Sequence, residues 1–457
     1  MNAIIFSAIW GLLMMFSGIF IRAKAAIRNL AIAGVAVLLL LNLAEMSHMS
    51  IFHINVRAML VFDSFGLLFN TVAFGATLIY LLLSAKDIDD VGVNQAEYFA
   101  LIFFVLCGVG IASSFNTLLM LFLGIEIISI PLYILTGSDK KNLKSNEASL
   151  KYFLMGSFST GIMLMGIALI YGASGSFAVA NMAKIANGFV PVMMAGLLLL
   201  LISMSFKVSA APFHFWTPDV YDGAPTVFTA FMATIVKAAV FVAFVRLFDA
   251  AYGPSLYQWR LTIAFIIAAT LFIGNITAVF QQSVKRMLAY SSIAQAGFMF
   301  FALFGYNEYA KEGIIIYAAA YSLATIGIFA ILIKMKDYTF DGYNGLAKQQ
   351  PLLAATNTIF LLSLAGIPAT AGFFAKYYML IAAVKNGAYL WLVIFAVLCA
   401  AVSAYYYFRV IQAMYFKEGN GQAKEVSNTF KIILALLAGL VVLLGIFPQL
   451  LTTHLYF

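Results

Sequence analysis

The chain has 457 residues, of which 64% are hydrophobic and only 10% charged, and its formal net charge is +8. Soluble globular proteins carry roughly 45–50% apolar and about 25% charged residues, so the composition excludes a soluble fold, intrinsic disorder and a collagen repeat. The apolar residues would fill about 14 spans of ~20 residues each, which predicts an all-α polytopic membrane protein embedded in a lipid bilayer.

Apolar runs between polar breaks give the predicted spans in chain order. They cover residues 3–21, 29–46, 63–85, 98–114, 116–136, 148–171, 190–211, 224–248, 261–281, 287–305, 313–334, 352–384, 388–415 and 430–451. Loops on one side of the membrane would hold fifteen Lys and Arg residues, Lys285 and Lys348 among them, and those on the other side five. The basic side is predicted to be cytoplasmic, which places both termini on the periplasmic or outer side.

Two of these spans are predicted to be broken. The seventh runs from Lys207 into Pro212 and Pro218, and the twelfth contains Gly366 and Pro368. Proline removes a backbone donor and interrupts a helix, and an interruption at membrane depth is tolerated only where it is buried or lines a wet cavity. Paired interruptions of this kind point to a transporter built from inverted repeats.

A second pattern supports the repeat. The stretch 152–161 is similar to 317–327 at an offset of 165 residues, and Lys207 and Lys376 lie 169 residues apart. Small residues that pack helices together would give a similar pattern. The shared offset favours two five-helix units.

No cofactor or metal site is expected in this chain. Cys107 and Cys399 lie in separate apolar runs, no CxxC spacing occurs, and neither a dinucleotide-binding nor a phosphate-binding glycine motif is present. The basic residues are scattered over short loops, so we expect them to mark one side of a membrane and no nucleic-acid partner.

Four charged residues lie deep inside predicted spans, where each costs ~2.5–3.5 kcal/mol and all four about 10 kcal/mol if unpaired. They are Glu126, Lys207, Lys237 and Lys376. The alternative is structural ion pairs or lysines that reach the membrane surface. One carboxylate cannot neutralise three lysines, so at least two of them need water, a backbone carbonyl, another subunit or a lowered pKa. Burial favours a neutral lysine and a nearby glutamate a charged one, so a lysine under both influences can take up and release a proton.

Further polar residues are secondary candidates. Lys151 opens the sixth span and fits an interfacial anchor as well as a relay residue. His214, between two prolines, can carry protons or satisfy the backbone at a helix break. Ser292 and Gln295 in the tenth span can order water or pair across helices.

Several stretches resemble a known family. The runs 206–226, 233–241, 284–297 and 366–376 are similar to the subunit N family of the bacterial proton-pumping NADH:quinone oxidoreductase, respiratory complex I. The resemblance covers essentially the whole chain. It implies three N-terminal helices in 1–97, antiporter-like five-helix units in 98–255 and 256–416, and a last helix in 417–457.

The resemblance also implies a function in a larger assembly. A membrane-arm subunit in the bacterial inner membrane would translocate protons without a redox centre of its own. NADH or another donor, FMN, iron–sulfur clusters and quinone would act in partner subunits, and the expected neighbours are the antiporter-like subunit M and the small subunits K and J.

Matching positions imply roles for the buried charges. Glu126 and Lys207 would form the interacting pair of the first unit, Lys237 the central relay and Lys376 the exit-side residue. Gln295 stands where many relatives have histidine, which indicates bound water there. We hypothesise that the Glu126–Lys207 pair opens and closes in response to neighbouring subunits and sends a proton along Lys237 toward Lys376.

Two other functions stay open on the sequence alone. One is a subunit of a multisubunit cation/proton antiporter or a membrane-bound hydrogenase from the same superfamily. The other is a membrane scaffold that has lost pumping, against which the four retained intramembrane charges argue.

Overall fold

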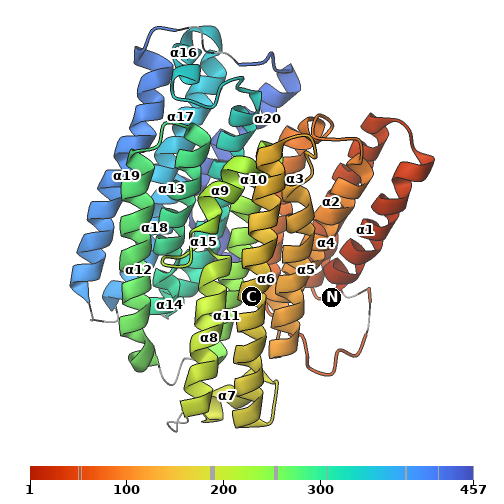
Figure 1. Cartoon of the computed structure of the whole chain (residues 1–457), viewed down its shortest axis with the longest axis vertical. Coiled ribbons are helices and arrows are strands. Elements are labelled where there is room, and N and C mark those ends of the chain that lie inside the picture. The colour runs from red at the N-terminus through yellow and green to blue at the C-terminus, as the bar shows by residue number, and fades with distance from the viewer. Residues whose placement is uncertain are drawn as a thin grey trace.

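The chain folds into a bundle of long helices that run roughly side by side (Figure 1). The computed structural model describes residues 1–455 except 50, 53, 186–190, 252–255, 306, 386, 388, 420 and 422. Within this part, twelve helices are long and apolar enough to cross a membrane, and α8 and α17 are shorter apolar helices. The predicted all-α membrane architecture is confirmed.

The first half of the chain holds eleven of the helices. They are α1 (Asn2–Phe20), α2 (Lys24–Met46), α3 (Ser64–Ile88), α4 (Gln95–Ser114), α5 (Leu118–Thr136), α6 (Leu143–Ser174), α7 (Val179–Ile185), α8 (Pro191–Lys207), α9 (Trp216–Gly223), α10 (Thr226–Phe231) and α11 (Lys237–Ala251). A π-helical turn, Met232–Val236, joins α10 to α11.

The second half continues in the same manner. It contains α12 (Leu256–Val279), α13 (Val284–Met299), α14 (Phe301–Gly305), α15 (Glu308–Lys334), α16 (Leu346–Gln349), α17 (Pro351–Ala365), α18 (Ala371–Lys385), α19 (Leu390–Phe416), α20 (Asn428–Ile446) and α21 (Gln449–Thr452). The predicted unit boundary at residue 255 lies outside the described residues, and the inverted repeat stays a prediction.

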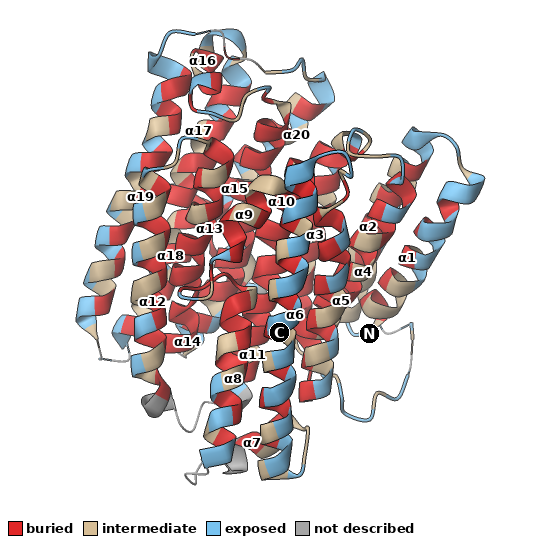
Figure 2. Ribbon diagram, viewed as in Figure 1, coloured by how far each residue is buried: buried red, intermediate tan, exposed pale blue. Residues whose placement is uncertain are grey.

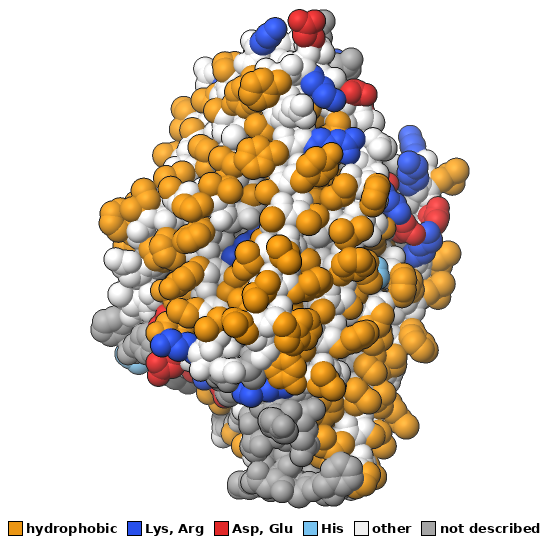
Figure 3. Space-filling view, turned by 90° about the vertical axis from the view of Figure 1, so that its left-hand side faces the viewer, with side chains coloured by type: hydrophobic (Ala, Val, Ile, Leu, Met, Phe, Trp, Pro, Cys, Tyr) orange, Lys and Arg blue, Asp and Glu red, His pale blue; other side chains and the backbone are white. Residues whose placement is uncertain are grey.

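Burial separates inner from outer helices. The apolar window of α15 and that of the α10–α11 helix are buried completely, whereas less than half of the residues in the windows of α1, α2, α6 and α19 are buried (Figure 2). Hydrophobic side chains cover the middle of the face in Figure 3, and most of its charged side chains lie nearer the ends. This is the surface that a lipid bilayer requires of a spanning bundle.

Both predicted helix breaks are present. The helix α8 ends at Lys207, and α9 begins only at Trp216, after a stretch that contains Pro212. The helix α17 ends at Ala365, and Gly366 then takes a φ of +86°, a left-handed conformation that glycine adopts without steric cost. Each break leaves backbone groups at a helix end without a partner inside the helix, so they are free to bind side chains.

A glycine lets the second break close tightly. A Cβ atom on Gly372, near the start of α18, would lie 1.8 Å from the carbonyl oxygen of Ser363 in α17. Because glycine has no Cβ, its backbone comes close enough for the Gly372 amide to donate to the Ser363 hydroxyl at 3.1 Å. The beginning of α18 therefore packs directly against the backbone of α17, and this positions Lys376 one turn later.

Candidate functional site

The first buried charge pair forms where α8 ends. Lys207 Nζ lies 3.5 Å from Glu126 Oε1, and the two side chains are 6% and 17% exposed. The same ammonium donates to the hydroxyls of Ser129 at 3.0 Å, Thr160 at 3.4 Å and Tyr133 at 3.5 Å. Thr160 in turn donates to Glu126 Oε1 at 2.7 Å, so one hydroxyl touches both members of the pair.

Helix geometry explains this grouping. Glu126, Ser129 and Tyr133 are spaced three and seven residues apart on α5, which places them on one face of the helix. Lys207 approaches that face from α8 and Thr160 from α6. The pair predicted for Glu126 and Lys207 is therefore in contact, inside a cage of hydroxyl groups.

Lys237 directly follows the π-helical turn and is buried in the centre of the bundle. Its Nζ donates to the carbonyl and to the hydroxyl oxygen of Ser292 in α13, both at 3.0 Å. It also lies 5.7 Å from the centre of the Tyr221 ring, whose π face attracts a cation. Of the secondary candidates, Ser292 is thus a direct partner of a buried lysine.

Lys376 occupies the second helix break. Its Nζ donates to the carbonyl oxygens of Leu364 and Ala365 at 2.9 Å each, and it lies 4.7 Å from the centre of the Phe298 ring. These carbonyls belong to the last turn of α17, where they lack helical partners and carry the negative end of the helix dipole. Lys237 and Lys376 are therefore held partly by backbone carbonyls. Such carbonyls are among the partners expected for the lysines that the single carboxylate of Glu126 cannot neutralise.

Gln295 links this lysine to a chain of tyrosines. Its Nε2 donates to Leu364 O at 3.0 Å and to the Tyr407 hydroxyl at 3.1 Å, and its Oε1 accepts from the Tyr317 hydroxyl. Gln295 and Lys376 line a small cavity. The centre of a water molecule can occupy about 10 Å³ of it, which is enough for one water.

Two secondary candidates lie apart from the buried lysines. Lys151 forms ion pairs with Glu147 at 2.8 Å and Asp219 at 2.9 Å and is 40% exposed. His214 is buried and stacks on Phe215, and its Nδ1 has no hydrogen-bond partner within the described chain. The structure thus brings together Glu126 with Lys207, Lys237 with Ser292, and Lys376 with Gln295 by way of Leu364, but not Lys151 or His214.

Several polar partners were not among the predicted site residues. Ser129 and Tyr133 could have been identified from the sequence, because helical spacing places them on the same face of α5 as Glu126. Thr160 lies on another helix, α6, so only the structure shows its contact with the pair. The hydroxyls of Ser205, Ser209 and Thr217 are buried around the break between α8 and α9, with no partner in the described part of the chain. Buried hydroxyls normally have a partner, and a bound water supplies one.

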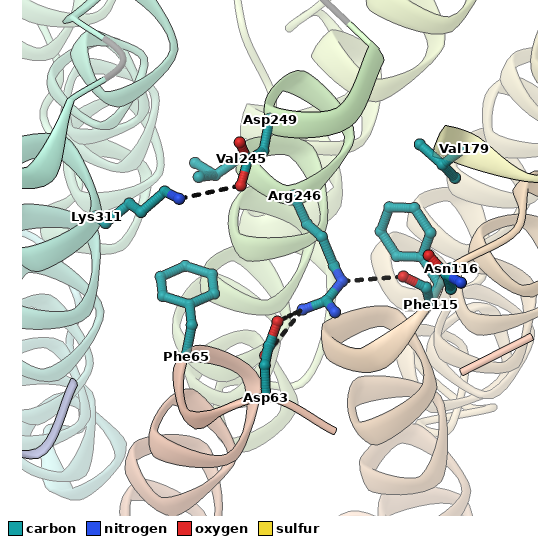
Figure 4. Close-up of a pocket in the computed structure, with 9 residues that line it drawn as sticks. All are labelled: Asp63, Phe65, Phe115, Asn116, Val179, Val245, Arg246, Asp249 and Lys311. Atoms are coloured by element: carbon teal, nitrogen blue, oxygen red, sulfur yellow. Dashed lines mark hydrogen bonds and ion pairs between the residues drawn. The ribbon is translucent and has the colours of Figure 1, made fainter. Parts of the chain in front are cut away.

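A second charged cavity, of about 190 Å³, lies at the ends of α3, α11 and α15 (Figure 4). Arg246 donates to Ser113 O at 3.0 Å and to Phe115 O at 2.9 Å, and pairs with Asp63 at 2.9 Å. Lys311 pairs with Asp249 at 3.0 Å. These hydrogen bonds and ion pairs join the N-terminal helices to α11, and α11 to α15. The charged residues around the cavity therefore hold these three parts of the bundle together.

Within the described residues, no group of three or more His, Cys, Asp or Glu side chains is placed to hold a metal ion. An all-helical membrane bundle with two interrupted helices and buried lysines at both breaks and at its centre defines a class of ion-translocating membrane proteins.

Comparison with known proteins narrows this class. The family described as "NADH:quinone oxidoreductase/Mrp antiporter, TM" matches residues 115–403. The NADH-quinone oxidoreductase subunit N of Cytophaga hutchinsonii is 41% identical over 456 residues, which cover 99% of this chain and 98% of the relative. The chain therefore belongs to the NADH:quinone oxidoreductase/Mrp antiporter family, within its subunit N group.

Solved structures agree with this assignment. A chain of respiratory complex I from Thermus thermophilus has a TM-score of 0.85 and 30% identity, over 98% of both chains. A chain of the Mrp complex from Dietzia sp. has the same TM-score of 0.85 at 19% identity, over 98% of this chain and 95% of that one. The second likeness shows that the fold is shared with Mrp complexes.

Proposed function

We propose that the chain is a membrane-arm subunit of a proton-translocating NADH:quinone oxidoreductase, in which protons pass from Lys207 by way of Lys237 to Lys376. The observation that carries this proposal is that all three lysines are buried and hydrogen-bonded to hydroxyls or carbonyls, while the carboxylate of Glu126 contacts only the first within the described residues. Such lysines can exchange protons with bound water. NADH, FMN, iron–sulfur clusters and quinone belong to partner subunits in this proposal.

The first step is at the Glu126–Lys207 pair. The carboxylate stabilises the protonated lysine, and Thr160 bonds to both groups. A movement that separates α8 from α5 removes that stabilisation together with the hydroxyls of Ser129 and Tyr133, and leaves the ammonium with Thr160 of α6. The proton then passes more readily to a neighbouring acceptor, so a conformational signal becomes a proton movement.

The following steps use water and hydroxyl groups. The unpartnered hydroxyls of Ser205, Ser209 and Thr217 offer binding places for water between α8 and α9. Lys237 is next, and its partner Ser292 lies beside the Tyr321 hydroxyl. From there the small cavity at Gln295 leads to Lys376.

The surroundings of the chain follow from the same proposal. The protein lies in a bacterial inner membrane with both termini on the outer side. In support, the N-terminus is drawn in the lower half of Figure 1, whereas α16, which carries Lys348 of the basic loops, lies at the top. The neighbours would be the antiporter-like subunit M and the small subunits K and J.

Membrane vesicles that contain the assembled complex test the proposal. Lys207→Ala and Lys237→Ala should each abolish most NADH-driven proton pumping, because each removes a buried proton carrier. Lys311→Ala, which removes a half-exposed ion pair, is the matched control and should pump normally. Normal pumping in both buried-lysine variants, at unchanged amounts of complex, would overturn the proposal.

The antiporter alternative is tested by deleting the gene. A subunit of this oxidoreductase is needed for NADH-driven pumping, which should then be lost. A cation/proton antiporter subunit would leave NADH oxidation and its pumping intact while abolishing cation-driven proton exchange.

A further inference from the structure

The short helix α9 is held by an acidic residue that two other helices share. The Asp219 carboxylate accepts from Lys151 of α6 through Oδ2 at 2.9 Å and from Arg286 of α13 through Oδ1 at 3.1 Å. Each oxygen thus serves one partner. The two partners lie in different predicted units, residues 98–255 and 256–416, so Asp219 connects these parts of the bundle.

The end of α9 is held by the neighbouring residue of α13. Lys285 is buried and donates to Asp222 O at 2.8 Å and to Ala224 O at 2.7 Å. Carbonyls at a helix C-terminus lack helical partners and attract a cation. Two residues in the first turn of α13 therefore bind α9: Arg286 binds the Asp219 side chain, and Lys285 binds the carbonyls at the end of the helix.

The same helix contacts both lysine sites. Trp216, its first residue, donates to the carbonyl of Phe206, the residue before Lys207, at 3.1 Å. Tyr221, five residues later, faces Lys237 at 5.7 Å. An eight-residue helix is about 12 Å long and moves as one body, so its position affects the surroundings of both lysines.

Aromatic packing carries the position of α9 further, to the first charge pair. The Trp216 ring stacks on Tyr152 with centroids 4.8 Å apart, and Tyr152 packs edge-on against Tyr133, also at 4.8 Å. The Tyr133 hydroxyl is one of the groups around Lys207. A shift of α9 therefore reaches the cage of the Glu126–Lys207 pair through two ring contacts.

We propose that Asp219 is a positioning residue for proton transfer: by binding Lys151 and Arg286 at once, it holds α9 where Lys207 and Lys237 are both in place to exchange a proton. This inference rests on the proposed function. The cluster lines a cavity of about 240 Å³ and its side chains are more than a third exposed, so its ion pairs can break and reform without stranding a charge in lipid. That suits a contact which opens during each turnover.

The test compares variants of α9 in vesicles that contain the assembled complex. Asp219→Asn removes the charge from both contacts, and two half-exposed ion pairs together correspond to about a fivefold shift between positions of the helix. NADH-driven proton pumping should fall about fivefold. The KM for quinone should stay unchanged, because the quinone is bound elsewhere, and Asp219→Glu should restore most of the pumping.

Asp222→Asn is the matched control. Its carboxylate only approaches Arg286 at 4.0 Å, and Lys285 binds its backbone oxygen, which the substitution keeps. Pumping should stay within about twofold of the unsubstituted protein. Equal losses in Asp219→Asn and Asp222→Asn would show a general effect of charge on this surface and overturn the inference.

A double-variant cycle tests the shared contact. Lys151→Gln alone should lower pumping. Adding it to Asp219→Asn should lower pumping no further, because the Lys151–Asp219 pair is already lost and the remaining pair of Lys151 with Glu147 lies within α6 and does not hold α9. Multiplied losses would overturn the inference. If Asp219→Asn reduces the amount of assembled complex, Lys151→Gln is measured in its place. Normal pumping in Lys151→Gln would then overturn the inference.

Lys207→Ala in the same assay separates the two proposals. If Lys207→Ala loses pumping while Asp219→Asn pumps normally, the role of Asp219 is wrong and the proton path stands. If Lys207→Ala itself pumps normally, the proposed function fails.

Discussion

Glu126→Gln removes one charge from the buried pair with little change in shape. At the 3.5 Å separation of Lys207 Nζ and Glu126 Oε1, two unit charges attract by about 5 kcal/mol at an effective dielectric constant near 20. Removing one partner of a buried pair typically costs about 3–5 kcal/mol. The three hydroxyls around Lys207 remain, so we take the lower value, about 3 kcal/mol.

This energy translates into a large effect on pumping. A loss of 3 kcal/mol corresponds to about two orders of magnitude in an equilibrium constant, so the ammonium of Lys207 loses most of the stabilisation that the carboxylate gives it. Glu126→Gln should therefore lower the NADH-driven proton-pumping rate at least about tenfold in vesicles with normal amounts of complex. Glu126→Asp keeps the charge one methylene further away and should retain a larger share of the rate.

Asp249→Asn is the control for this experiment. It also removes one acid from an ion pair with a lysine, but both side chains are 46% exposed and such pairs contribute at most about 1 kcal/mol. The rate should change less than about fivefold. The reasoning is refuted if Glu126→Gln pumps at the unsubstituted rate, or if the two variants lose equal shares.

Three further outcomes are expected from other parts of the structure. Gly372→Ala places a methyl group 1.8 Å from the Ser363 carbonyl oxygen and should prevent assembly, whereas Gly439→Ala, with no atom within 4 Å, should leave the amount of complex on a native gel unchanged. Gln295→Leu removes three hydrogen bonds beside Lys376 and should lower pumping more than Gln295→His, which keeps a polar ring; equal rates would speak against a role for this residue. Arg246→Ala removes the donor to three carbonyls and to Asp63 and should destabilise the bundle by about 2–3 kcal/mol, measured as a lower thermal unfolding temperature of the assembled complex.

The helix breaks were predictable because their causes are local. Pro212 and the Gly366–Pro368 stretch interrupt a helix through the chemistry of their own backbone, and the structure interrupts the chain at these places. The hydrophobic runs located the helices for a similar reason, since a long apolar run in a membrane protein has few alternatives to a helix.

The partners of the charges were harder to foresee. The Glu126–Lys207 contact was expected from a family resemblance and not from the residues alone. Lys285 was counted with the basic loop residues, yet it is buried and holds the end of α9, more than sixty positions away in the chain. Thr160 likewise meets its partners only through packing of α6 against α5. Contacts between distant segments depend on how helices approach each other, which no local pattern specifies.

The π-helical turn Met232–Val236 sets the register of the helix that follows it. An α-helix rotates about 100° per residue, so deleting one residue of this turn would turn the whole of α11 by that angle relative to α10. Lys237 would then point away from Ser292, and Arg246, nine residues further along, would leave Asp63. The contacts of the central lysine and of the distant arginine therefore both depend on the rotation of α11 about its axis. The number of residues in the turn sets that rotation, so both contacts require this segment to keep its length.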